Sequence, residues 1–234
     1  MVWQQIREAI GLTEGGRLRA ALDVLVRRDH AAPSSAVREA KGATFTAAVI
    51  ALSAKMAQAD GAVVELERRM FERLYPVDEA QQRSVHWLFE LATKDIAGFE
   101  SYAGQVATLL ADDPAMKRDV LEGLFHIAVA DGVLHDNEEI YLARVAHIFS
   151  YSETEFRAIR ALFVSDPEDP YIVLGVAHKA SNAEIKAHYR QLVRENHPDA
   201  MMARGLPKEF IAMADRTLAA INAAYDQIAK ERGL

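Results

Sequence analysis

Apolar residues recur every three or four positions along almost the whole chain, and this spacing constrains the fold more than any other feature. The clearest stripes are Phe45, Val49, Leu52 and Met56, and further along Leu142, Val145 and Phe149. Side chains spaced in this way share one face of an α-helix. No stretch alternates between apolar and polar residues with the β-branched enrichment that is typical of a strand. The sequence therefore predicts an all-α fold.

Composition and charge narrow the class of protein. Half of the residues are hydrophobic and 26% are charged, which is typical of a globular chain. Cysteine is absent, which excludes disulfides, thiolate metal sites and a cysteine nucleophile. The longest stretch without a charged side chain, residues 42–54, is too short to span a bilayer, and the chain does not begin with a secretory signal. Together with the net charge of −7, which disfavours a nucleic-acid partner, these features predict a cytoplasmic protein without a membrane span.

Two proline-containing segments divide the chain. The sharper one is Ser-Asp-Pro-Glu-Asp-Pro over 165–170, where two prolines prevent a helix from continuing. The weaker one, Ala-Pro-Ser-Ser over 32–35, follows an N-terminal helical segment over 1–34. We therefore predict a helical domain over 35–164, a short linker over 165–170 and a second helical domain over 171–234.

The first domain contains an internal repeat. Residues 57–67 and 128–138 both read A-x-A-D-G-x-apolar-x-acid-x-E, where x is any residue. The simpler interpretation is a helical hairpin used twice, in which each Gly ends one helix and the acids begin the next, near its positive dipole end. The alternative is a divalent cation, because carboxylates in short loops are the ligands that Ca²⁺ and Mg²⁺ prefer, although the spacing is not that of an EF-hand loop.

Residues 35–163 resemble the TerB-like helical domain of DjlA-type membrane co-chaperones. The resemblance is carried by residues 130–138, by Tyr-Leu-Ala-Arg-Val-Ala over 141–146, and by Tyr-Ser-Glu-Thr-Glu-Phe over 151–156. It implies a helical bundle with clustered acids that bind a cation. The ligands implied by matching position are Asp60, Asp131, Asp136 and Glu138. DjlA-type proteins typically begin with a membrane segment, and this chain shows none. Either the chain is a soluble branch of the family or the segment was trimmed, and Met1 favours the soluble branch.

The second domain reads as a helical hairpin. A short apolar turn closed by Gly175 comes first, and Ser181 or Asn182 then caps a helix that runs to about Glu195, with Glu184 in its first turn. A second long helix is expected after the turn that follows Glu195. Its inward stripe is predicted to be Phe210, Met213, Thr217, Leu218, Ile221, Tyr225 and Ile228.

The first helix of the hairpin has a basic face that ends at a distinctive turn. Lys186, Arg190 and Arg194 recur every four residues, so their side chains line up along the helix. The turn that follows contains His197-Pro198-Asp199. The proline fixes its own φ and biases His197 towards an extended backbone, so this turn presents its side chains in few directions.

Four motifs of this domain occur in order: D-P-Y-x-V-L-G-V, S-x-x-E-I-K-x-x-Y-R-x-L-V, H-P-D and I-N-x-A-Y-D. Together they resemble a J-domain, the module of DnaJ-type co-chaperones. The resemblance implies a non-enzymatic protein that docks on a DnaK-type ATP-dependent chaperone and stimulates its ATPase. The implied chaperone-binding residues are His197, Pro198, Asp199, Lys186, Arg190 and Arg194. In one departure from the family, Ala200 stands where Lys is common.

Chemistry assigns separate roles within this set. The basic row, formed by Lys186, Arg190 and Arg194, is expected to meet an acidic groove on the chaperone, because complementary charges speed and orient encounter. Asp199 is expected to accept a bidentate hydrogen bond from an arginine of the chaperone, while His197 braces the turn or contacts the partner. The alternative function is a metal-sensing or stress-sensing protein, or an adaptor, whose TerB-like half binds a cation or an unidentified protein and whose J-domain recruits the chaperone.

Overall fold

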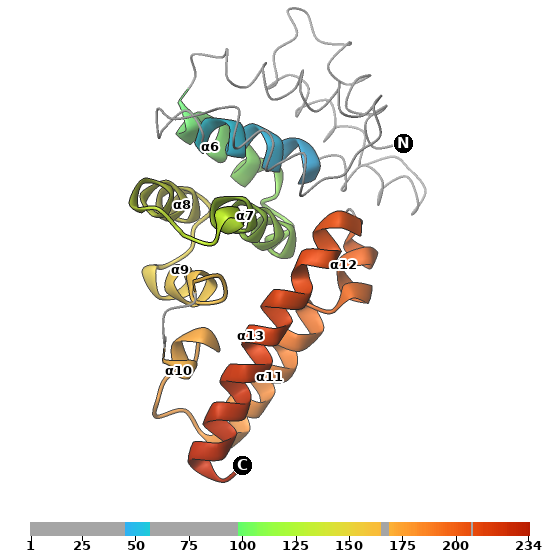
Figure 1. Cartoon of the computed structure of the whole chain (residues 1–234). Helices are drawn as coiled ribbons and strands as arrows, with labels where there is room; N and C mark the ends of the chain where they lie inside the picture. The colour runs from blue at the N-terminus through green and yellow to red at the C-terminus, as the bar shows by residue number, and fades with distance from the viewer. Residues whose placement is uncertain (1–44, 57–97, 165–168, 207) are drawn as a thin grey trace, which may run out of the picture.

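The computed structural model describes residues 45–56, 98–164, 169–206 and 208–234 of the chain, and every regular element in these ranges is a helix (Figure 1). This confirms the predicted all-α fold. After a helical segment over 45–56, the first half contains α6 (Phe99–Leu109), α7 (Pro114–Ala128), the 3₁₀ helix η2 (Val129–Asp131), α8 (Asp136–Ile148) and α9 (Glu153–Arg160). The second half contains α10 (Pro170–Val173), α11 (Asn182–Glu195), α12 (Pro198–Arg204) and α13 (Lys208–Arg232). None of the described helices combines the length and the apolar character needed to cross a bilayer.

The hairpin begins where its local sequence predicts. Ser181 is the N-cap of α11: its hydroxyl accepts the Glu184 backbone N–H at 3.2 Å, and the Glu184 carboxylate accepts the Ser181 N–H at 2.7 Å. This reciprocal capping satisfies donors that a helix start otherwise leaves unpaired. Gly175 closes the preceding turn with φ +65°, a conformation that only glycine adopts without strain. The long pair α11 and α13 then lies side by side, with α12 at the end nearest α7 (Figure 1).

The larger core belongs to both halves of the chain. The predicted stripe Phe45, Val49, Leu52 and Met56 is fully buried there, together with side chains from α6, α7, α8 and α9. Three residues of the second half complete this core: Met201, Leu206 and Phe210. Because burying one large apolar side chain stabilises a fold by about 1.5–3 kcal/mol, the contribution of the second half is substantial.

A smaller core holds the hairpin together. It is formed by apolar residues of α10, α11 and α13, among them Tyr171, Leu174, Ile185, Ile221 and Ile228, and by Leu162 from the end of the first half. The predicted inward stripe of the last helix therefore divides between the two cores, since Phe210 faces the first half of the chain while Ile221 and Ile228 face α11. Thr217 is also buried, Leu218 and Tyr225 are half-buried, and the Met213 side chain lies outside the described residues.

The segment after Glu195 differs from the prediction of a turn leading directly into a long helix. His197 is the N-cap of α12 and Pro198 is its first residue, so the His-Pro-Asp motif begins a short helix. Proline suits this position because the first helical N–H has no partner within the helix. Gly205 ends α12 with φ +88°, and α13 begins only at Lys208.

Three other predictions concern residues that the structure does not describe, so they stay predictions. The N-terminal segment over 1–34, the first copy of the repeat with Asp60, and residues 165–168 of the predicted linker all lie outside the described residues. The last two linker residues, Asp169 and Pro170, are the N-cap and first residue of α10.

Candidate functional site

The His-Pro-Asp motif presents an exposed carboxylate at the start of α12. Asp199 is the most open member, with 80% of its side chain exposed. The Nδ1 atom of His197 accepts the Asp199 backbone N–H at 3.2 Å, so the imidazole caps the helix that it begins. Because Nδ1 is the acceptor, a neutral ring carries its proton on Nε2. The histidine thus fixes the backbone of the motif and keeps one donor facing outward.

A groove of about 440 Å³ runs along α11 to this motif. It is lined by Tyr189, Arg190, Val193, Arg194, His197, Asp199 and Ala200. The structure therefore brings two of the three predicted cations together with the predicted His and Asp, while Lys186 is half-buried one turn further along the helix. Neither arginine of the groove forms an ion pair with an acid among the described residues, so both charges face solvent.

Aromatic stacking between α11 and α13 supports one side of the groove. The rings of Tyr189 and Tyr225 stack with centroids 3.9 Å apart and planes 10° apart, and the Tyr189 hydroxyl donates to Asn222 Oδ1 at 3.0 Å. This contact joins α11 to α13 beside the cations. A stacked aromatic pair contributes about 0.5–1.5 kcal/mol of stability beyond its area burial. The stacking therefore helps to fix the position of Tyr189, which lines the groove.

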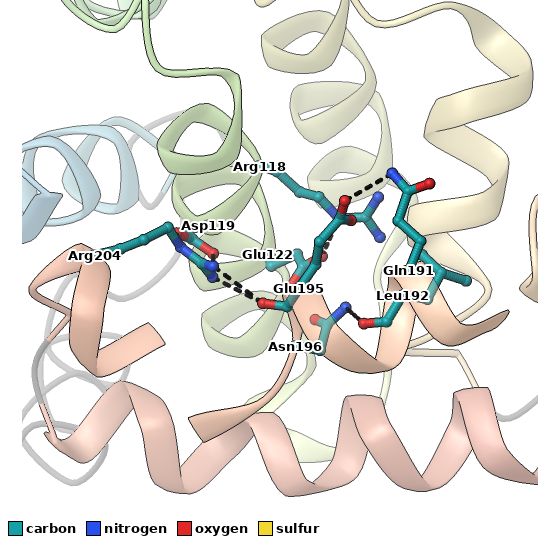
Figure 2. Close-up of polar contacts among 8 residues, drawn as sticks. All are labelled: Arg118, Asp119, Glu122, Gln191, Leu192, Glu195, Asn196 and Arg204. Carbon is teal, nitrogen blue, oxygen red and sulfur yellow. Dashed lines mark hydrogen bonds and ion pairs between the residues drawn. The ribbon is translucent and has the colours of Figure 1, made fainter. Parts of the chain in front are cut away.

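An ion pair that sequence analysis missed supports the motif from the side of the first half (Figure 2). Arg204, the last residue of α12, donates from Nε and Nη2 to the Asp119 carboxylate of α7 at 2.7 and 2.8 Å. Its Nη1 and Nη2 also donate to the carbonyl oxygen of Glu195 at 3.1 Å each. Burial raises the pKa of the Asp119 carboxyl to about 7, against the opposing influence of Arg204. The sequence signal was Asp119 on the otherwise apolar face of α7, between Met116 and Gly123.

Further polar contacts hold the end of α11 (Figure 2). The buried Asn196 donates to the carbonyl oxygen of Leu192 both from its backbone N–H, at 3.0 Å, and from its side-chain Nδ2, at 2.9 Å. Gln191 donates to the Glu195 carboxylate at 2.8 Å. These contacts tie the end of α11 together up to the residue that precedes the motif.

Two acidic residues of the second repeat copy accept backbone N–H groups at or just before the start of α8. Asp131 accepts the Val133 N–H at 3.0 Å, which lowers its pKa, and it also contacts His135. The buried Glu138 accepts the His135 N–H at 2.9 Å in a capping box, and Asp136 begins α8. Gly132 ends η2 with φ +97°, as the hairpin interpretation predicts.

No group of three His, Asp or Glu side chains within the described residues is arranged to hold a metal ion. The cation therefore stays a prediction, because Asp60, its fourth proposed ligand, belongs to the part of the chain that the structure does not describe.

Comparison with known proteins finds a matching family for each half of the chain. Residues 46–161 match the family model of the tellurite resistance protein TerB, and residues 169–232 match that of the DnaJ domain. The co-chaperone protein DjlA of Photobacterium profundum is 30% identical over 223 residues, which cover 83% of this chain and 80% of the relative. DjlA of Coxiella burnetii is 30% identical over 200 residues, or 76% of this chain and 74% of the relative. No solved structure matches the chain.

Proposed function

Since this chain belongs to the DjlA family of J-domain co-chaperones, we propose that it stimulates ATP hydrolysis by a DnaK-type chaperone through His197, Pro198 and Asp199. The family is non-enzymatic, so the protein acts on a reaction that its partner catalyses. The observation that carries the proposal is the groove that joins the exposed Asp199 carboxylate to Arg190 and Arg194.

Docking is the role of the basic row. Arg190 and Arg194 are exposed and have no ion-pair partner in the described part of the chain, and Lys186 extends the row by one turn. An exposed charge pair contributes only about 0.2–1 kcal/mol, so three such contacts add modest affinity. Their larger effect is on encounter rate and orientation, which complementary charge controls. The row therefore brings the His-Pro-Asp motif to the correct face of the chaperone.

Triggering is the role of the motif. The Asp199 carboxylate is 80% exposed, with one oxygen 3.7 Å from His197 Nδ1, and it can receive the paired donors of an arginine. His197 contributes by capping α12, which fixes the backbone that carries Asp199. No proton transfer is required of either residue. Stimulation follows if the motif binds the hydrolysis-competent conformation of the chaperone more tightly than its resting conformation, because only differential binding shifts such an equilibrium.

Substitution of His197 by Gln tests the proposal. In single-turnover ATP hydrolysis by a DnaK-type chaperone, we expect H197Q to lose the stimulation that the unmodified chain gives, while its helical circular dichroism is unchanged. His147→Gln is the matched control, because His147 is an exposed histidine of α8 far along the chain from the groove. Equal stimulation by H197Q and H147Q would falsify the proposal.

A further inference from the structure

We infer that Asp119 of the TerB-like half is a positioning residue for the His-Pro-Asp motif of the J-domain, acting through Arg204. The inference rests on the proposed function only for the importance of the motif, since the contacts themselves belong to this chain alone. It assigns the TerB-like half a direct part in the geometry of the trigger.

Arg204 closes the segment that carries the motif. Glu195 is the last residue of α11 and Arg204 is the last residue of α12, and His-Pro-Asp lies between them. Two N–H groups of Arg204 converge on the Glu195 carbonyl oxygen at 3.1 Å each. The two ends of the segment are thereby tied together, and the start of α12 is held at a set angle to α11.

Asp119 fixes the guanidinium that makes this closure. The pairing is bidentate, with N···O distances of 2.7 and 2.8 Å, so it sets the plane of the group as well as its position. Once the plane is set, the donors left over point in fixed directions, and here they point at Glu195. A lysine could not reproduce this arrangement, because an ammonium group has no fork.

Net stabilisation is a weak explanation for the pair. Only 5% of the Asp119 side chain is exposed, and its raised pKa reports the cost of burying the charge. Removing two charges from water costs about as much as their attraction returns, so a buried ion pair is weak evidence for stability. Apolar contacts already anchor this region, since Met201, Leu206 and Phe210 enter the larger core. The ion pair adds orientation to that anchorage.

Asp119→Asn in the full chain tests the inference. The amide keeps the shape of the carboxylate but loses its charge and one acceptor. We expect amide hydrogen exchange over residues 196–204 to accelerate by about tenfold through local opening, with exchange at the start of α11 unchanged. Glu139→Gln is the matched control, because it removes a 2.9 Å ion pair with Arg160 that lies wholly within the TerB-like half.

ATPase stimulation supplies the second readout. We expect D119N to lower the maximal stimulation at least threefold while the concentration for half-maximal effect stays constant, because Arg190 and Arg194 are untouched. Arg204→Lys should have the same effect, and the double variant should be no worse than R204K alone, since Asp119 acts through Arg204. Wild-type exchange over 196–204 in D119N, or losses that add in the double variant, would overturn the inference.

Failure of the proposed function is separable from failure of this inference. Hydrogen exchange is measured on the chain alone, so accelerated exchange in D119N supports the positioning role whether or not a chaperone responds. If the unmodified chain stimulates ATP hydrolysis but D119N shows unchanged hydrogen exchange, the proposed function is retained and the inference is rejected.

Discussion

Phe210 of the J-domain lies edge-on against Phe45 of the TerB-like half, with ring centroids 4.8 Å apart and planes at 65°. Both rings are fully buried. Edge-to-face packing is a favoured arrangement of aromatic rings, and it requires both partners to be held in place. The beginning of α13 is therefore part of the core of the first half, and the two halves should lose stability together when this contact is disturbed.

Overpacking at Gly123 should show this directly. A Cβ atom at Gly123 of α7 would lie 3.1 Å from Phe210 Cε2 and 3.3 Å from Val49 Cγ2, which is closer than ordinary packing permits. We expect Gly123→Val to lower the free energy of unfolding by about 1–3 kcal/mol in urea titrations. Gly104→Val is the control, because a Cβ there meets nothing within 4 Å. A loss as large in G104V would mean that helix propensity, and not contact with Phe210, sets the cost.

Stability should fall in acid through His126. Burial lowers the pKa of His126 to about 4, and the positive charge of Arg216 acts in the same direction, whereas an unfolded histidine titrates near 6.5. The folded state thus favours the neutral ring. The stability that the neutral His126 ring contributes is fully present above pH 6.5 and is lost as the pH falls from 6.5 through 4. The loss in the free energy of unfolding amounts to about 3 kcal/mol.

The measurement is a comparison of the unfolding free energies of the unmodified chain and His126→Leu across this range. Asp119, whose raised pKa gives a pH dependence of opposite sign, is common to both proteins and cancels in the difference. The unmodified chain should lose stability relative to H126L as the pH falls. A difference that stays constant with pH would contradict the prediction.

Glu138 and Asp136 distinguish a helix cap from a cation site. If Glu138 acts as the capping partner of His135, Glu138→Ala should lower stability by about 1–2 kcal/mol, and Asp136→Ala, at an exposed position, by less. Neither loss should change when Ca²⁺, Mn²⁺ or Mg²⁺ is added. A cation bound by the folded state would instead raise the thermal midpoint of the unmodified chain, and both variants would forfeit that rise.

Local signals in the sequence predicted the hairpin well. The start of α11 at Asn182 and its end at Glu195 both match, because Ser181 and Glu184 form a capping box that depends on no distant residue. The burial of Phe210 was also predicted from its place in an apolar stripe. The identity of the core that receives it was not, since periodicity states which side is apolar but not what covers it.

Two features of the site required the structure. The short helix α12 was missed, although Pro198 and Asp199 are typical of a helix start and Gly205 of a helix end. The pairing of Asp119 with Arg204 spans 85 residues, and nothing in the sequence distinguishes that arginine from the other cations as its partner. A buried acid signals that a partner exists, but only the three-dimensional arrangement identifies it.

The placement of Met201, Leu206 and Phe210 limits how this J-domain can be transplanted. A chimera that joins only residues 169–234 to an unrelated domain would carry these three apolar side chains to the surface, next to an arginine deprived of its carboxylate. Such a graft is expected to self-associate and to show a distorted trigger. The smallest portable unit therefore has to include α7 and the helical segment over 45–56 that covers Phe210.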